Sequence, residues 1–285
     1  MLFFEAGPLL FLPSMCRRLC VTVRLFTCIV SHGHADFLIS ALPNFLSAKN
    51  LYLCVVDNIG QSSLRDFCSA HGIAYIAQEV KLGFGANNNR AFRYFEKNFH
   101  FREADYFICC NPDVWILPGM LEALSSSLDL HKPQIAGINL FVDEQYQFFD
   151  SSIRRFPRLG DYLKKALFSY DGTALDKSTI TTPVVCDWAA GSFLVFSVQL
   201  FKALEGFDEH YFMYFEDVDI CLRAWRARGQ RVLYIPNVRA VHFAAFRNRA
   251  FFSKHFRWYV SSLVRYLWRF YFHGLRPAKD TSSPL

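Results

Sequence analysis

The sequence predicts an α/β fold built on a doubly wound sheet, and three features of the chain support this prediction. Apolar, β-rich runs alternate with helical patterns through the first half, which favours a mostly parallel sheet. Polar clusters follow three of these runs, at the sheet edge where ligands bind in such folds. Hydrophobic residues make up 52% of the 285 residues, enough for a large core.

The expected elements follow in chain order. In the first half, apolar runs predict strands at 21–31, 51–57, 73–76 and 106–110. The patterns between them predict helices at 35–47, 64–70 and 85–98. After an irregular stretch at 143–183, we expect a strand at 190–196, a helix at 198–204, a turn at 206–208, a helix at 216–228 and a strand at 231–235. The last fifty residues are expected to be helical, basic and aromatic.

Three segments are expected along the chain: an N-terminal extension at 1–20, a main domain at 21–243 and a tail at 244–285. The extension is apolar, but Glu5 and two prolines make it a poor signal peptide, so Met15 is a candidate start. No stretch of about 18 residues is free of charge, which predicts that the chain has no membrane span.

Charge and cysteine content limit the kinds of partner and the cellular compartment that the sequence is compatible with. No acidic residue lies between Asp219 and Asp280, whereas thirteen Lys and Arg occur from Arg223 to Lys279. This asymmetry predicts an anionic partner for the C-terminal end, either a membrane or a nucleic acid. None of the nine cysteines forms a Cys-x-x-Cys pair. They are typical of buried thiols in a reducing compartment.

Two polar clusters are candidates for binding a nucleotide. Asp57 and Asn58 end the second expected strand, where a carboxylate can accept a hydrogen bond from a base or ribose; a turn cap is the alternative. The segment 83–89 holds two glycines and three asparagines before a helix. Glycines allow a ligand to approach the backbone, and a helix N-terminus favours an anion. The alternative is an ordinary capped helix start.

A metal and a catalytic base are the next candidates. Asp113 follows an apolar strand, where Mg²⁺ or Mn²⁺ bridging two phosphates would bind, with His242 as a distant ligand. A turn at Asp113 and a structural histidine are the alternatives. Asp219 and Arg223 are four residues apart and should pair. Glu216 and Asp217 then remain in the first helical turn, either as a general base or as compensation of the helix dipole.

The order of these motifs resembles the inverting glycosyltransferases of family 2, which have the GT-A fold. The matching motifs are IVSHGH at 29–34, DN at 57–58, GFGANNN at 83–89, NPD at 111–113, DWAAGSF at 187–193, GFD at 206–208, YFMYFEDVD at 211–219, YIP at 234–236 and His242. Within the family, the chain is most similar to bacterial O-antigen rhamnosyltransferases acting on N-acetylglucosaminyl-diphospho-undecaprenol. The tail sequence NR at 248–249 and FFSK at 251–254 supports this narrower similarity.

The resemblance implies a reaction and a set of roles. L-rhamnose would pass from dTDP-β-L-rhamnose to the 3-hydroxyl of the acceptor sugar, at the cytoplasmic face of the bacterial inner membrane. The donor-binding residues would be Ser31, His32, Asp57, Asn58, Gly83, Phe84, Gly85, Asn87, Asn88, Asn111 and Asp113. Asp217 would be the catalytic base, and Trp188, Gly191 and Glu216 would contact the acceptor. Asn111 stands where the common metal motif of the family has an aspartate.

The tail predicts an amphipathic helix at a membrane interface. The residues expected to contact an anionic surface are Lys254, Arg257, Trp258, Arg265, Trp268 and Arg269. A helix packed on the core with a solvated basic face would give the same pattern. No nucleic-acid-binding motif occurs, so a nucleic-acid partner is not expected.

Two further functions are compatible with the motifs of the main domain. One is the same fold with a UDP-sugar donor, because the spacing of the motifs does not reveal the shape of the sugar pocket. The second is a non-catalytic module that binds a nucleotide sugar or a lipid. Both Asp113 and Asp217 are present, which favours an enzyme over such a module.

Overall fold

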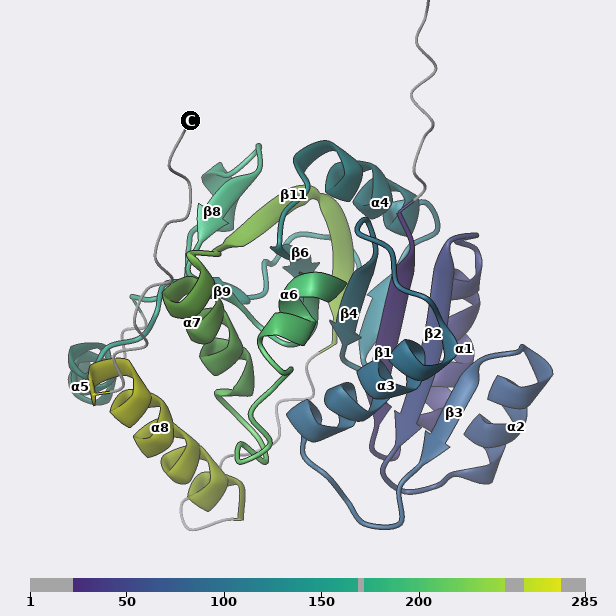
Figure 1. Cartoon of the computed structure of the whole chain (residues 1–285). Helices are drawn as coiled ribbons and strands as arrows, with labels where there is room; N and C mark the ends of the chain where they lie inside the picture. Colours follow the sequence, from purple (N-terminus) through teal and green to yellow (C-terminus); the bar gives the residue numbers. More distant parts are fainter. Residues whose placement is uncertain (1–22, 169–171, 244–253, 273–285) are drawn as a thin grey trace, which may run out of the picture.

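The computed structural model describes residues 23–168, 172–243 and 254–272 and confirms the predicted α/β class (Figure 1). A sheet of nine strands lies between two layers of helices. The expected extension at 1–20, including Met15, lies outside the described residues, as do parts of the expected tail.

The first half of the sheet is parallel. It contains β1 (Leu25–Ser31), β2 (Leu51–Asp57), β3 (Ala74–Ala77) and β4 (Tyr106–Cys110) in the spatial order β3-β2-β1-β4. Because parallel strands end at the same sheet edge, the polar residues after β1, β2 and β4 gather there.

The second half makes the sheet mixed. β10 (Phe193–Ser197) lies antiparallel between β4 and β6 (Ile135–Phe141), and β11 (Val232–His242) runs parallel to β6. The short strands β5 (Val114–Ile116) and β8 (Val184–Cys186) both pair antiparallel with β11. An antiparallel β10 brings its N-terminal residues to the edge where β4 ends, which adds Gly191 and Ser192 to that edge.

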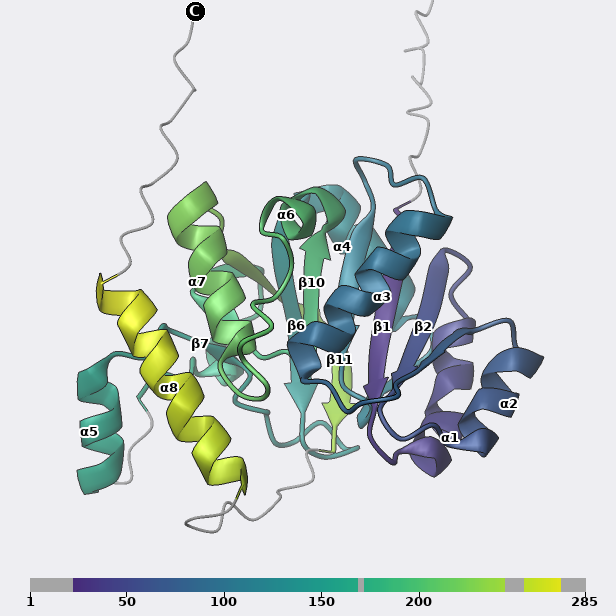
Figure 2. The same ribbon diagram turned by 60° about the horizontal axis from the view of Figure 1, so that its bottom comes forward.

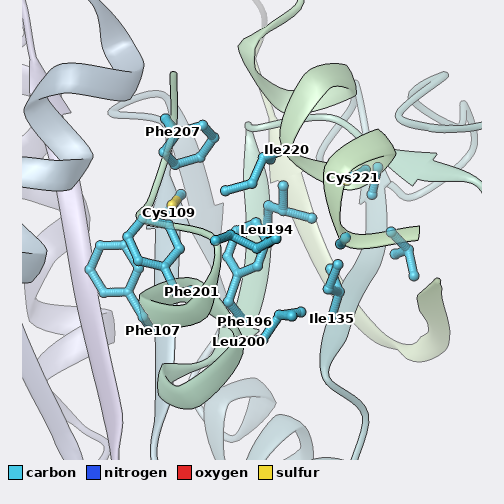
Figure 3. Close-up of a cluster of buried hydrophobic side chains, with 14 of the residues drawn as sticks. Phe107, Cys109, Ile135, Leu194, Phe196, Leu200, Phe201, Phe207, Ile220 and Cys221 are labelled. Carbon is cyan, nitrogen blue, oxygen red and sulfur yellow. The ribbon is translucent and has the colours of Figure 1, made fainter. Parts of the chain in front are cut away.

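Helices bury one hydrophobic cluster on each face of the sheet. On one face lie α1 (Ala35–Leu46), α2 (Ser62–Ala70) and α4 (Met120–His131). On the other lie α3 (Phe84–Asn98), α6 (Val198–Ala203) and α7 (Glu216–Arg228). Figure 3 shows Leu194 and Phe196 of β10 between Phe107 and Phe201 on one side and Ile220 of α7 on the other. This packing fixes the start of α7, which carries the acidic cluster.

The irregular middle of the chain forms a wall beside the sheet edge. It contains β7 (Ile153–Arg154), α5 (Leu159–Phe168) and the 3₁₀ turn η1 (Lys177–Thr179), and β7 pairs with β9 (Trp188–Ala189) in a two-stranded sheet. The C-terminal helix α8 (Lys254–Phe272) lies beside α5 and packs against α7 (Figure 2). Within the described ranges, no helix combines the length and the hydropathy needed to cross a bilayer.

Several expected boundaries were wrong by a few residues. β1 pairs with β2 from Leu25, not from position 21, and β10 begins at Phe193, because a turn occupies the residues before it. The expected strand at 231–235 continues to His242 through a bulge after Ile235. Pro236 lies in this bulge and has no N–H for the ladder, while its carbonyl accepts from Asn139 at 3.3 Å.

Candidate active site

A cavity of about 580 Å³ opens at the edge where β4 and β11 end. Its walls come from the start of α3, the ends of β4 and β11, the middle segment, the start of α7 and one residue of α8. Phe84, Asn111, Asp150, Arg154, Trp188, Gly191, Glu216, Asp217, His242 and Tyr259 are among its lining residues. The cavity thus brings together predicted donor, acceptor, metal and catalytic residues.

Asp217 is held in a fixed orientation at the N-terminus of α7. Its Oδ2 accepts a hydrogen bond from the Gly191 backbone N–H at 2.9 Å, and its Oδ1 accepts from the Val218 N–H at 2.8 Å. Burial raises the pKa of Asp217 above its usual value, while these backbone contacts oppose the increase. The carboxylate is therefore a stronger base than a surface aspartate, and it lines the cavity.

Glu216 lies beside Asp217 but in a different environment. Its side chain is buried, and its Oε2 has no hydrogen-bond partner within the described structure. Burial, and secondly the charge of Asp217, raise the pKa of Glu216 to about 8. At neutral pH Glu216 is therefore mostly a neutral acid that can donate a hydrogen bond, whereas Asp217 is the charged member of the pair.

An unusual backbone conformation precedes this pair. Tyr214 and Phe215 both have left-handed φ angles, 71° and 66°, which are uncommon for residues with bulky side chains. The strain is tolerated because Phe215 stacks on Tyr266 of α8 and Ser262 of α8 donates to the Met213 carbonyl at 3.0 Å. The helix α8 thus supports the turn that aims Glu216 and Asp217.

A second charged group lies at the ends of β4 and β11. His242 Nε2 is 3.4 Å from Asp113 Oδ1 and 3.3 Å from Asn111 Nδ2, and His242 Nδ1 is 2.7 Å from Asp150 Oδ2. Burial disfavours the charged imidazole, but contacts with Asp113 and Asp150 outweigh burial and raise the pKa of His242 to about 9. The predicted proximity of Asp113 and His242 is therefore present.

These residues fit a divalent cation in part. Asp113 Oδ1 is buried and accepts no well-formed hydrogen bond from the described residues, so it is available as an oxygen ligand. Asp150 holds the far nitrogen of His242, as carboxylates commonly do behind metal-binding histidines. Over the described part of the chain, however, no group of three His, Cys, Asp or Glu side chains is arranged to hold a metal. A cation here would need donor phosphate oxygens as further ligands.

The glycines of the 83–85 motif serve packing between loops. A Cβ on Gly83 would overlap the Phe212 carbonyl, and one on Gly85 would lie 2.8 Å from Phe207 Cβ. Glycine at these positions therefore allows the loop before α7 to approach α3 closely. The expected contact of these glycines with the donor stays a prediction. Phe84, between them, does line the cavity.

Most of the side chains predicted to contact the nucleotide make hydrogen bonds inside the protein. The Asp57 carboxylate is fully buried and accepts from the Ile59 and Gln61 backbone N–H groups and from the Tyr75 hydroxyl. Asn87 donates to Asn58 Oδ1 at 3.2 Å and accepts from Gln78. Asp57 and Asn58 therefore make the local turn and loop contacts that the capping alternative describes, whereas Asn87 lies inside α3 and does not cap it. Their roles in donor binding stay predictions.

Several predicted donor residues keep spare hydrogen-bonding capacity at the sheet edge. Ser31 Oγ and Asn88 Oδ1 are buried without a partner in the described residues, as is Ser192 Oγ nearby. The His32 backbone N–H donates to the His34 ring. Because buried polar atoms are nearly always satisfied, these orphaned atoms favour a polar ligand at this edge.

The predicted acceptor residues lie on the opposite wall. The Trp188 indole N–H donates to the Arg155 carbonyl at 3.0 Å, which presents the ring to the cavity. A Cβ on Gly191 would lie 2.9 Å from Phe84 Cε1 and 3.6 Å from Asp217 Cβ. Glycine at 191 therefore lets the base and Phe84 approach the same backbone.

The predicted membrane residues divide between two faces of α8. Arg269 points inward and pairs with Asp219 at 2.5 Å and Asp208 at 2.9 Å, and Trp258 stacks on Phe212. Neither residue is on the exposed face of α8, because this side of the helix packs against the protein. Asp219 also pairs with Arg223 at 2.9 Å, as predicted. The exposed side of α8 includes Lys254, Arg257, Val260, Val264, Arg265, Trp268, Tyr271 and Phe272.

Sequence reasoning missed several residues of the site. Asp150 and Arg154 line the cavity from the middle segment that showed no periodicity. Lys177 is buried beneath this segment and donates to Ser152 Oγ at 3.0 Å, and burial lowers its pKa to about 8. Tyr259 reaches the cavity from α8. The clearest sequence signal that could have pointed to these residues was a cluster of charged residues in an otherwise unassigned stretch.

The chain matches a family described as "Glycosyltransferase like family 2" over residues 39–261. It is 36% identical to Rhamnosyltransferase WbbL of Escherichia coli over 247 residues, which are 86% of this chain and 93% of that protein. It is 29% identical to the N-acetylglucosaminyl-diphospho-decaprenol L-rhamnosyltransferase of Mycobacterium tuberculosis over 153 residues, 50% of this chain and 48% of the relative.

A solved structure shows the same fold. The S. aureus TarS fragment 1–349 superposes with a TM-score of 0.53 at 12% identity, covering 76% of this chain, and the chain spans 60% of that structure's length. This likeness supports the fold, whereas the match over residues 39–261 supports the family. The protein is a glycosyltransferase with a GT-A fold, and it belongs to glycosyltransferase family 2.

Proposed function

We propose that the chain transfers L-rhamnose from dTDP-β-L-rhamnose to the 3-hydroxyl of N-acetylglucosaminyl-diphospho-undecaprenol, with inversion at the anomeric carbon. The observation that carries this proposal is the Asp217 carboxylate, fixed by two backbone N–H groups in a cavity that His242 also lines. The similarity to WbbL and to the mycobacterial enzyme supports both the sugar and the acceptor class.

In this proposal the donor diphosphate lies by Asp113 and His242, and the acceptor sugar lies between Trp188 and Asp217. The acceptor hydroxyl attacks the anomeric carbon from the side opposite the diphosphate, and Asp217 accepts its proton. Neutral Glu216 has an oxygen without a partner in the described residues and can hold a sugar hydroxyl. Positioning and stabilisation of the leaving diphosphate supply most of the acceleration.

Asp113, and His242 after losing its proton, would hold Mg²⁺ or Mn²⁺ together with phosphate oxygens of the donor, and the cation would neutralise charge on the leaving group. Asp150 keeps His242 in place through its Nδ1 contact. Asn111 lies 3.3 Å from His242 Nε2 and is a neutral neighbour where a second carboxylate would add charge.

The exposed side of α8 is proposed to dock on an anionic membrane, at the cytoplasmic face of the bacterial inner membrane. Val264, Trp268 and Phe272 are 62%, 58% and 70% exposed, an apolar stripe on one side of the helix. Lys254, Arg257 and Arg265 flank this stripe, and each contributes about 1 kcal/mol of attraction near an anionic surface. A lipid-linked acceptor is met at such a surface.

A transfer assay tests the proposed reaction. Purified protein is given a synthetic N-acetylglucosaminyl-diphospho-lipid with dTDP-rhamnose, UDP-N-acetylglucosamine or UDP-galactose, with and without Mg²⁺. We expect transfer from dTDP-rhamnose alone, and loss of transfer when a chelator removes the cation. Transfer from a UDP-sugar alone would keep the mechanism and overturn the donor. Firm donor binding without transfer from any donor would favour a binding module.

A further inference from the structure

The cavity has a permanently charged side chain, Arg154, in addition to His242. Among its lining residues within the described chain, Arg154 is the one Arg or Lys. Its guanidinium donates from Nε to the Ser151 carbonyl at 2.7 Å and from Nη1 to Thr173 Oγ1 at 2.8 Å. His242 is held by Asp113 and Asp150 instead. Arg154 and His242 therefore face one cavity from separate supports.

Strand pairing fixes Arg154 in the acceptor wall. Residue 154 pairs antiparallel with Trp188 in the two-stranded sheet and bridges to Ala174 on its other side. Its guanidinium carbon lies 5.8 Å from the centre of the Trp188 ring. A side chain on a strand paired on both sides keeps its direction, as a binding group needs.

Arg154 lies on the side of the cavity where the acceptor is proposed to bind. Its charge acts on Asp217, whose pKa it lowers against the effect of burial. Tyr162, Met213 and Tyr259 line the same cavity toward α8 and offer an apolar path for a lipid chain. A group near both the base and this path is well placed for the charged link between acceptor sugar and lipid.

We propose that Arg154 binds the diphosphate of the lipid-linked acceptor, while the Asp113–His242 end takes the diphosphate of the donor; this inference rests on the proposed function. Arginine suits the task because its planar guanidinium offers paired donors to phosphate oxygens. Separate binding groups for the two diphosphates would let both substrates occupy the cavity at the same time. An acceptor sugar on a neutral link would lose this contact.

The test compares acceptors with and without the diphosphate. Arg154→Gln is assayed with an alkyl-diphosphate N-acetylglucosaminide and with the matching uncharged alkyl N-acetylglucosaminide. We expect kcat/KM for the charged acceptor to fall about 10- to 100-fold more than kcat/KM for the neutral acceptor, as for loss of a charged hydrogen bond, with the KM for the donor unchanged. A change in the pKa of Asp217 caused by loss of the Arg154 charge would affect both acceptors alike. Arg154→Lys keeps the charge and should retain part of the preference.

Arg155→Gln is the matched control, because the neighbouring arginine lines a different pocket with Arg158 and Arg231. It should leave the preference for the charged acceptor intact. Inhibition by an alkyl diphosphate without sugar gives a second measurement: Arg154→Gln should weaken it about tenfold or more. Equal loss on both acceptors, or a raised donor KM, would overturn the role of Arg154. Failure of the unmodified protein to transfer any sugar would instead overturn the proposed function.

Discussion

The Gly191 backbone N–H donates a 2.9 Å hydrogen bond to Asp217 Oδ2, joining the start of β10 to the start of α7. The Val218 N–H holds the other oxygen at 2.8 Å. One carboxylate is thus fixed by two segments that are distant in the sequence but adjacent at the sheet edge. The two N–H groups favour the charged form of Asp217 over that of its neighbour Glu216, which supports Asp217 as the proposed base.

Replacing the base by asparagine removes proton acceptance with little change in side-chain volume, and it also loses one of the two backbone hydrogen bonds. Asp217→Asn should lower kcat by about 10²- to 10⁴-fold, the usual contribution of a general base. Donor affinity, measured by calorimetry with dTDP-rhamnose, should change little, because Asp217 does not contact the diphosphate in the proposed arrangement. A variant with unchanged kcat would remove Asp217 from the mechanism.

The raised pKa of Glu216 predicts that replacing it by a neutral side chain increases the stability of the protein, and that this increase depends on pH. Since its folded pKa of about 8 exceeds the unfolded value of 4.5, the neutral form is favoured in the folded protein. Its stabilising contribution is complete below about pH 4.5 and is lost as pH rises toward 8. Glu216→Gln should therefore match the parent in Tm at pH 5 and exceed it at pH 8.

The size of this gain follows from the free energy involved. Each pKa unit corresponds to about 1.4 kcal/mol, and each kcal/mol to roughly 2 to 4 °C in a domain of this size. Thermal unfolding of both proteins across pH 5 to 8 measures the difference. A Tm difference that does not grow with pH would show that Glu216 is ionised throughout.

Gly83 tests whether its motif serves packing. Alanine at this position would place Cβ against the Phe212 carbonyl, so the loop before α7 must shift. Gly83→Ala should lower stability by about 1 to 3 kcal/mol and reduce kcat, because that loop leads into Asp217. Gly160→Ala is the control, since nothing lies within 4 Å of its added Cβ. Equal Tm values for the two variants would contradict the packing role.

The two faces of α8 should respond differently to substitution. Trp268→Asp, on the exposed side, should reduce binding to phosphatidylglycerol vesicles in a flotation assay and leave Tm unchanged. Arg269→Gln, on the inner side, should lower the free energy of unfolding by about 1 to 3 kcal/mol, because buried Asp219 loses one of its two cationic partners. Vesicle binding that is insensitive to Trp268 would place the membrane contact elsewhere.

Long, continuous patterns made much of the fold predictable. β2, β4 and α7 were expected with their observed bounds, because uninterrupted apolar runs and a helical period define them. β7 and β9 have two residues each and β5 has three, too few to show any period. Their strands form because partners distant in sequence pair with them, and a single sequence does not reveal that pairing.

The site was partly predictable for a related reason. Residue type and position after a strand singled out Asp113, and the structure places its carboxylate 3.4 Å from His242 as expected. At Asp57 the same reasoning left a turn cap as the alternative, and there the carboxylate accepts from its own turn. The roles of Asp57, Asp113, Asp217 and His242 in the reaction stay predictions. The partnership of Asp150 with His242, 92 residues away, depends on tertiary packing alone.

The measurement that tests the central claim most directly is the anomeric configuration of the transferred sugar, determined by NMR on the product made from dTDP-β-L-rhamnose. A single displacement assisted by Asp217 predicts an α-linked rhamnose. A β-linked product would require two displacements or a different geometry, and would contradict the mechanism.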